Sequence, residues 1–101
     1  MAKIDLRKEA RGRPCQIRLT AHEVHNHDQA TVSLHHCRSK RLFKVGMGQK
    51  PPDIFGCWAC AICHGIIHHP NEHGQDPEMI LIEEYEAIFR TQNILYQEGK
   101  L

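Results

Sequence analysis

Apolar residues recur at intervals of three and four positions in the last quarter of the chain. The recurring positions are Met79, Ile82, Tyr85, Ile88 or Phe89, and Leu95 or Tyr96. This spacing places apolar side chains on one side of an α-helix. Asp76 suits an N-cap, Pro77 the first helical position, and Gly99 a helix end. The pattern predicts a long amphipathic helix over about residues 76–98. We expect its apolar side to pack on the core, with a partner-binding face as the alternative.

Shorter patterns upstream predict strands. Residues 16–20 and 31–35 alternate polar and apolar side chains, and residues 54–58 form a short apolar run. The first two segments flank a polar, histidine-rich turn, so we expect them to pair as an antiparallel hairpin. Asp5 is expected to cap a short helix over residues 6–10, and another is expected from Cys60 to about His68. The basic stretch 38–52, with its glycines and prolines, predicts an irregular loop.

Length and composition indicate one small domain over residues 1–101. A domain of this size buries a modest core, so a structural metal is a natural supplement. No apolar run approaches the roughly 20 residues that span a bilayer, and the acidic, apolar-poor start does not resemble a secretory signal. We therefore expect a cytoplasmic protein without a membrane partner. There, the five cysteines are expected to be metal ligands or thiols rather than disulfides.

The net charge of +1 conceals an asymmetry between the two halves. Residues 1–50 hold eleven Lys and Arg against four Asp and Glu, whereas the remainder holds two against eight. This split suggests one side that faces a polyanion and an acidic opposite side. A solvated basic surface without a partner is the alternative.

Cys60 and Cys63 form a Cys-x-x-Cys pair at the start of a predicted helix. A structural zinc site takes four tetrahedral ligands, chiefly thiolate and imidazole. We expect Cys15 and His25 to complete the site from upstream of the helix. The alternatives are His22 and His27 in the same turn, and Cys37 and Cys57.

A second group of histidines lies outside that zinc site. His35, His36 and His64 are expected to face one another, where imidazoles can hold a divalent cation and activate a water. His68 follows His64 by one helical turn and is a further candidate ligand. The alternative is that some of these are surface histidines, as we expect for His69 and His73.

Four segments together resemble a known family. They are residues 6–13 (LRKEARGR), 15–18 (CQIR), 50–53 (KPPD) and 59–64 (ACAICH). In these the chain resembles the small endonucleases of lambdoid phages and prophages, of the HNH or ββα-metal class. The resemblance covers about residues 6–69.

The resemblance implies an α+β fold, a small zinc-stabilised ββα-metal, treble-clef-like domain followed by the long helix. It implies structural Zn²⁺ on Cys15, Cys60 and Cys63, with His25 where the family usually has cysteine. It implies that His36 is the general base and that His64 and His35 bind a catalytic Mg²⁺, Mn²⁺ or Zn²⁺. The asparagine of the HNH name would fall near Phe55, where only Asp53 is polar.

The leading hypothesis is therefore a metal-dependent DNA endonuclease. Phosphate contacts are expected from four basic residues, Arg18, Arg38, Lys40 and Arg41. Such contacts give affinity but little sequence specificity. A homodimer through the long helix is a further expectation. The alternative function is a non-catalytic zinc module that binds nucleic acid or a protein. A thiol redox protein is disfavoured, because no thioredoxin-like βαβ pattern surrounds the Cys-x-x-Cys pair.

Overall fold

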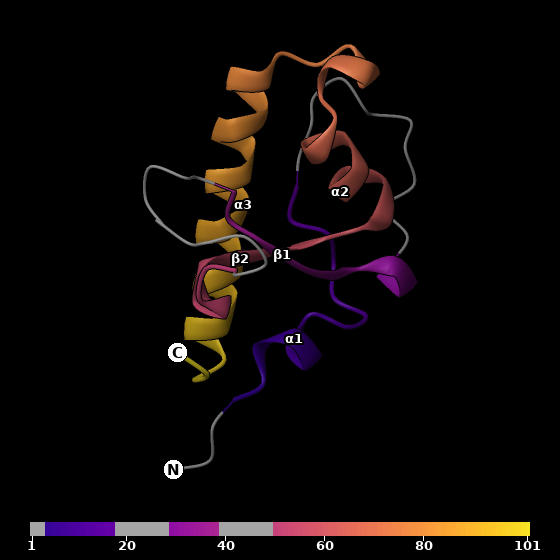
Figure 1. Ribbon diagram of the computed structural model, residues 1–101. Coiled ribbons are helices and arrows are strands. Elements are labelled where there is room, and N and C mark those ends of the chain that lie inside the picture. The colour runs from indigo at the N-terminus through magenta and orange to yellow at the C-terminus, as the bar shows by residue number, and fades with distance from the viewer. Residues whose placement is uncertain (1–3, 18–28, 39–49) are drawn as a thin grey trace.

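The computed structural model describes residues 4–17, 29–38 and 50–101 (Figure 1). Its elements, in chain order, are α1 (Leu6–Glu9), η2 (Gln29–Thr31), β1 (Ser33–His36), η3 (Asp53–Phe55), β2 (Gly56–Ala59), α2 (Ala61–His68), η4 (Asn71–His73) and α3 (Pro77–Gln97). The expected α+β composition and the long C-terminal helix are confirmed. None of the helices in the described ranges is long and apolar enough to cross a membrane.

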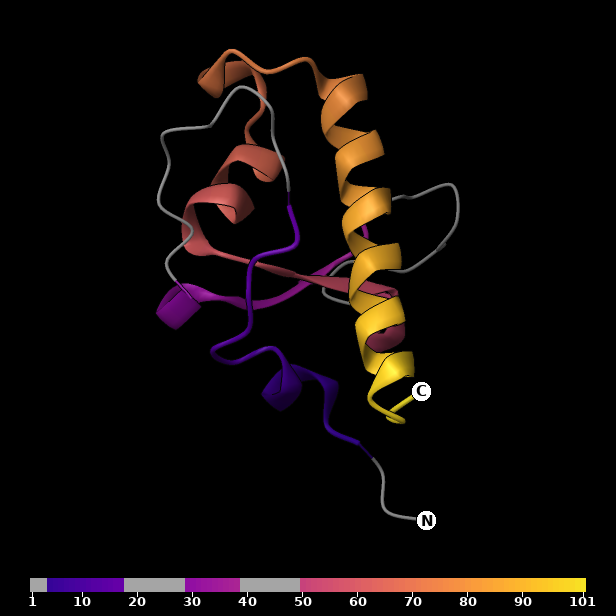
Figure 2. The same cartoon turned by 180° about the vertical axis from the view of Figure 1, so that it is seen from behind.

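The two strands pair with each other in antiparallel register. Leu34 lies opposite Trp58, His35 opposite Cys57, and His36 opposite Gly56. In Figures 1 and 2, α2 lies on one side of the two strands and α1 on the other. Because side chains alternate along a strand, His35 and His36 point to opposite sides of this small sheet.

The predicted hairpin between residues 16–20 and 31–35 is wrong at residues 16 and 17, the described part of its first strand. Among the described residues the partner of β1 is β2, and residues 16 and 17 are irregular. The backbone N–H of Gln16 donates to the carbonyl of Trp58 at 2.8 Å, so this segment lies against β2 instead. β2 is buried along its whole length, and such a strand requires backbone partners on both edges. Residues 18–28 lie outside the described ranges.

The long helix α3 packs across β2 and runs past both strands (Figure 2). Asp76 caps it by accepting the backbone N–H of Glu78 at 3.0 Å, as predicted from the sequence. The buried side of α3 was predicted only in part: Ile88 and Leu95 are buried and Tyr85 packs against the core, but the start of the predicted stripe is not buried. Its buried residues are Ile80, Glu84, Ala87, Ile88, Thr91 and Leu95. Met79, Ile82, Phe89 and Tyr96 are exposed.

The polar residues on the buried side of α3 have partners in the sheet region. The Thr91 hydroxyl accepts the backbone N–H of Trp58 at 3.2 Å. Glu84 accepts the backbone N–H of Arg38 at 2.8 Å. The helix is therefore rotated so that these two polar side chains face inward, which explains the error in the predicted phase.

The first helix is held near the end of α3. Asp5 caps α1 by accepting the backbone N–H of Arg7 at 3.1 Å, as the sequence predicts. Arg13 then makes two short bonds to the Glu98 carboxylate, at 2.6 and 2.7 Å. The same guanidinium lies 4.7 Å from the centre of the Trp58 ring. This arrangement joins the N-terminal segment, the sheet and α3.

Candidate functional site: a cysteine group and a histidine group

Three cysteines meet where α2 begins. The thiols of Cys15, Cys60 and Cys63 lie within 4.8 Å of one another. Cys60 is the N-cap residue of α2, and the three-residue spacing places Cys63 beside it in the first turn. The backbone N–H of Cys60 donates to the Cys15 sulfur at 3.4 Å. The structure thus joins Cys15 to the Cys-x-x-Cys pair across 45 positions of sequence.

The chemistry of this group suits a cation. Contact with Cys15 and burial raise the pKa of the Cys63 thiol far above its usual range. Burial also raises the pKa of the Cys60 thiol. Three neighbouring thiols resist ionisation because each thiolate would repel the others in a buried place. A divalent metal reverses this cost, since it binds thiolates directly at about 2.3 Å for zinc.

The remaining candidate ligands are placed as follows. His22, His25 and His27 lie outside the described residues, so the fourth ligand stays a prediction. Cys37 and Cys57 are buried and belong to neither group of potential metal ligands within the described ranges. Burial also raises the pKa of the Cys57 thiol, and because Cys57 lies apart from the cysteine group, we interpret it as a packing residue.

Three histidines form a second group between β1 and α2. The potential ligand atoms of His35, His64 and His68 also lie within 4.8 Å of one another. The rings of His64 and His68, one helical turn apart, stack with centroids 4.8 Å apart. The His35 ring meets the His64 ring edge-on at 4.7 Å. From the sequence we expected His35, His36 and His64 together, with His68 as a further candidate. The structure brings His68 into the group and leaves His36 outside it.

The imidazoles of α2 are held in the form that binds metals. Burial lowers the pKa of His64 to about 4, and the neighbouring rings of His35 and His68 add to this shift. Burial and the charge of Arg38 lower the pKa of His68. At neutral pH both rings are therefore uncharged and carry a lone pair for a cation.

A buried carboxylate from α3 supports the histidine group. Glu84 is 1% exposed, and its Oε2 lies 3.6 Å from Nε2 of His35. Burial alone raises the pKa of Glu84, but the His35 ring and the Arg38 N–H outweigh it and hold this pKa below its usual range. A carboxylate beside a histidine ligand commonly fixes the orientation of the ring. Sequence reasoning missed Glu84, because a charged residue within a helix gives no sign of burial.

His36 has its own carboxylate partner. Its Nε2 lies 2.7 Å from Oδ1 of Asp53, which comes from η3. The hydrogen bond with His36 lowers the pKa of Asp53, and the charge of Arg7 adds to the effect. Arg7 in turn lies 3.5 Å from the other carboxylate oxygen. Asp53 therefore stands as an anion that can orient the His36 ring.

His36 and the histidine group line one pocket of about 310 Å³. Its wall also includes Lys50 and Arg38. The guanidinium of Arg38 donates to the carbonyl of Ile67 near the end of α2, so this residue is partly engaged in the fold. The other predicted phosphate-binding residues, Arg18, Lys40 and Arg41, lie outside the described ranges.

Sequence comparisons identify the relatives of this chain. The family model described as "Putative nuclease YbcO" matches residues 4–100. A protein of Escherichia coli (strain K12) with that name is 41% identical over 98 residues, covering 94% of this chain and 94% of the relative. A protein of Enterobacteria phage 82 named "Putative nuclease ybcO" has the same identity and coverage.

A solved structure agrees with these comparisons. It is described as "Structure of a putative bacteriophage protein from Escherichia coli str. K-12 substr. MG1655" and matches with a TM-score of 0.71. The sequence identity is 35%, and the match covers 94% of this chain and 100% of that chain. The family model spans nearly the whole chain, and the curated relatives carry a nuclease name. The chain therefore belongs to the family described as "Putative nuclease YbcO".

Proposed function

We propose that the chain is a metal-dependent DNA endonuclease of the HNH type, with His36 as the general base. The observation that carries this proposal is the shared pocket. His36, oriented by Asp53, lines the same pocket as His35, His64 and His68, although its ring leaves β1 on the opposite side from that of His35. A base beside a possible cation site is the arrangement that phosphodiester hydrolysis requires.

His36 would take a proton from the attacking water. The neutral tautomer that donates its Nε2 proton to Asp53 leaves Nδ1 as the acceptor. Asp53 then stabilises the charged imidazole after proton transfer, because the carboxylate is already an anion. Asp53 thus fills the orienting role for which the sequence offers no HNH asparagine.

The histidine group would hold the catalytic cation. His35, His64 and His68 supply three nitrogens from two elements, and Glu84 supports the most buried of them. A bound divalent ion would supply charge neutralisation at the phosphoryl oxygens. Mg²⁺, Mn²⁺ and Zn²⁺ are all candidates, and three imidazoles favour a transition metal over Mg²⁺.

The cysteine group would hold a structural Zn²⁺. Cys15, Cys60 and Cys63 supply three thiolates, and we propose His25 as the fourth ligand. This ion would join the N-terminal segment to the start of α2, and with it fix His64 one position after Cys63.

The test is nicking of supercoiled plasmid with each metal added in turn. His36→Ala should lower the rate about 10²- to 10⁴-fold, the usual contribution of a general base. His73→Ala is the matched control, because His73 is exposed in η4 and belongs to neither group of potential ligands. Equal rates for His36→Ala and the parent would refute the assigned base.

The alternative function is a zinc-dependent binding module without catalysis. It is favoured by one observation: no carboxylate within the described ranges belongs to the histidine group. DNA binding without cleavage under Mg²⁺, Mn²⁺, Zn²⁺ and Ni²⁺ would support this alternative. The expected homodimer remains a prediction, for which sedimentation equilibrium is the direct measurement.

A further inference from the structure

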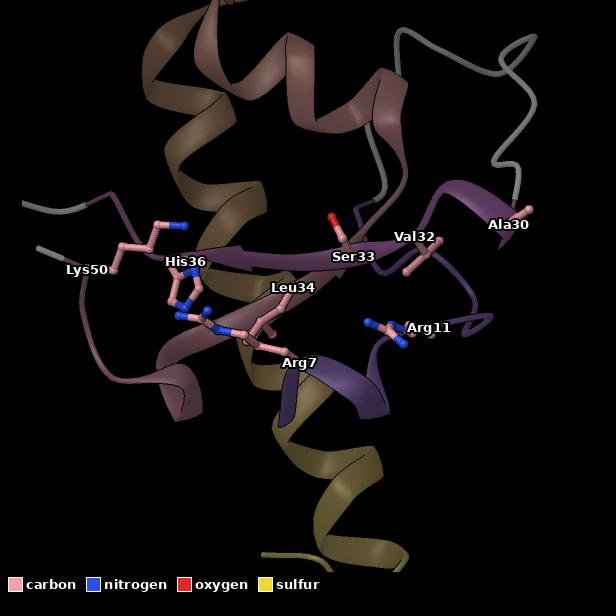
Figure 3. Close-up of a pocket in the computed structure, with 8 residues that line it drawn as sticks. All are labelled: Arg7, Arg11, Ala30, Val32, Ser33, Leu34, His36 and Lys50. Atoms are coloured by element: carbon pink, nitrogen blue, oxygen red, sulfur yellow. The ribbon is translucent and has the colours of Figure 1, made fainter. Parts of the chain in front are cut away.

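A basic groove lies on the side of the sheet away from α2. It is a pocket of about 500 Å³ between α1 and β1 (Figure 3). Arg7 and Arg11 come from α1 and the turn after it, and Lys50 from the opposite end of the groove. Leu34 of β1 and Val32 just before this strand contribute apolar surface, and Ser33 between them contributes a hydroxyl. The groove therefore carries cations at its rim and a mixed apolar and polar surface beneath them.

The cations of the groove are available to a ligand. Arg11 and Lys50 are exposed and form no ion pair with another described residue. The side chain of Arg7 is 62% exposed, with Asp53 as its partner. Of the two acids nearest in sequence, Glu9 is already bonded to Arg13 and Lys100, and Asp5 caps α1. The positive charge is thus only partly neutralised within the fold.

The groove adjoins the histidine pocket. Leu34, His36 and Lys50 line both spaces. Figure 3 shows His36 with Arg7 on one side of its ring and Lys50 on the other. An extended anion with one charge beside His36 therefore has a path toward Arg11.

We propose that this groove binds the phosphodiester backbone of DNA on one side of the cleaved bond, through Arg7, Arg11 and Lys50. The identity of the anion as DNA rests on the proposed function. One guanidinium group can donate two parallel hydrogen bonds to two oxygens of the same phosphate. Contacts to phosphate position a protein on DNA without reading its sequence, so we expect the three cations to give position and affinity rather than sequence recognition. These three residues differ from the four basic residues expected from the sequence.

The test is fluorescence anisotropy with a labelled DNA duplex and a single strand of equal length. The full chain is used without added Mg²⁺ or Mn²⁺, and a gel confirms that the DNA is uncut. The variants are Arg11→Gln and Lys50→Gln. Lys8→Gln is the matched control, because Lys8 is exposed on the same helix but does not line the groove. Urea unfolding of each variant verifies the fold.

Each groove variant should bind the duplex about eightfold more weakly at 0.1 M salt, which is the counterion-release effect of one phosphate contact. The slope of log K against log salt should fall by about 0.9 for duplex and about 0.7 for single strand. Lys8→Gln should bind as the parent does. Groove variants that bind as tightly as Lys8→Gln would overturn the proposal, as would a loss that depends on the base sequence.

The outcomes separate the groove from the nuclease function. Weaker binding by the groove variants, together with a parent that never cleaves, supports the groove and refutes the catalytic proposal. Unchanged binding together with metal-dependent cleavage by the parent refutes the groove and supports the catalytic proposal.

Discussion

Replacement of Glu84 by alanine should be among the most damaging single changes in α3. The carboxylate is buried and accepts the backbone N–H of Arg38 at 2.8 Å. A hydrogen bond to a charged group contributes about 1.5–3 kcal/mol, and the lost methylene adds about 0.8 kcal/mol of burial. Glu84→Ala should therefore lower the free energy of unfolding by about 2–4 kcal/mol. Glu84→Gln keeps an acceptor and the shape, so its loss should be about 1–2 kcal/mol.

Urea unfolding is a direct assay for this prediction. Trp58 is the single tryptophan and is 1% exposed, so its fluorescence reports on the core near β2. Glu86→Ala is the control on the same helix. Its side chain is 54% exposed and pairs with Arg90 across one helical turn. Such a pair contributes about 0.3–0.5 kcal/mol. If Glu84→Ala and Glu86→Ala are equally stable, the role assigned to the buried carboxylate is wrong.

Metal affinity distinguishes support of the fold from orientation of His35. Isothermal titration with Ni²⁺ or Co²⁺ should show about 10- to 100-fold weaker binding for Glu84→Gln, the usual effect of losing a partner of a histidine ligand. Glu86→Ala should retain the affinity of the parent. Reduced stability without reduced affinity would leave the packing role intact and exclude the orienting role.

Three further predictions concern the sheet, the end of α3 and the cysteine group. Gly56→Ala should cost about 1–3 kcal/mol in urea unfolding, because an added Cβ lies 2.8 Å from the Leu34 side chain; an unchanged midpoint would show that β1 yields freely. The hydrogen bond from Arg13 lowers the pKa of Glu98 from 4.5 to about 2. The stabilisation of the fold by the ionised Glu98 is therefore complete above pH 4.5 and is lost as the pH falls toward 2. The urea midpoint of Glu98→Gln should accordingly fall less steeply than that of the parent over this pH range. Cys63→Ser should reduce bound zinc by about one ion per chain in elemental analysis, given the four ligands of a structural site, whereas equal zinc content would place the ion elsewhere.

Local signals in the sequence were sufficient for the three α-helices but not for the short helical turns η2, η3 and η4. Asp76 and Pro77 mark the start of α3 because they act within one turn, and α3 begins at Pro77 as they indicate. The buried side of α3 was not predictable in the same way. Glu84 and Thr91 face inward only because Arg38 and Trp58 present backbone donors to them. Those donors come from distant segments, so hydrophobic periodicity alone cannot reveal them.

The strand partners and the histidine group show the same contrast between features set by local sequence and features set by contacts between distant segments. Alternation predicted a strand near residues 31–35, and β1 lies at Ser33–His36. Its partner β2 packs against α3, and no local pattern in the sequence records either contact. Successive side chains of a strand point to opposite faces, so the prediction of a strand here already implied that His35 and His36 face different sides of the sheet. The spacing of His64 and His68, one helical turn apart, was the available signal for the third histidine.

The bond between Arg13 and Glu98 has a consequence for the order of folding. It joins residues 85 positions apart, and closing so long a loop is entropically costly until other contacts have formed. During synthesis, a chain that has emerged only as far as α2 lacks both this bond and the helix that covers β2. The Trp58 region would then be open to solvent and to other nascent chains. Folding of the sheet is therefore expected to wait for α3, and chaperone contacts should concentrate on β2 before that helix is complete.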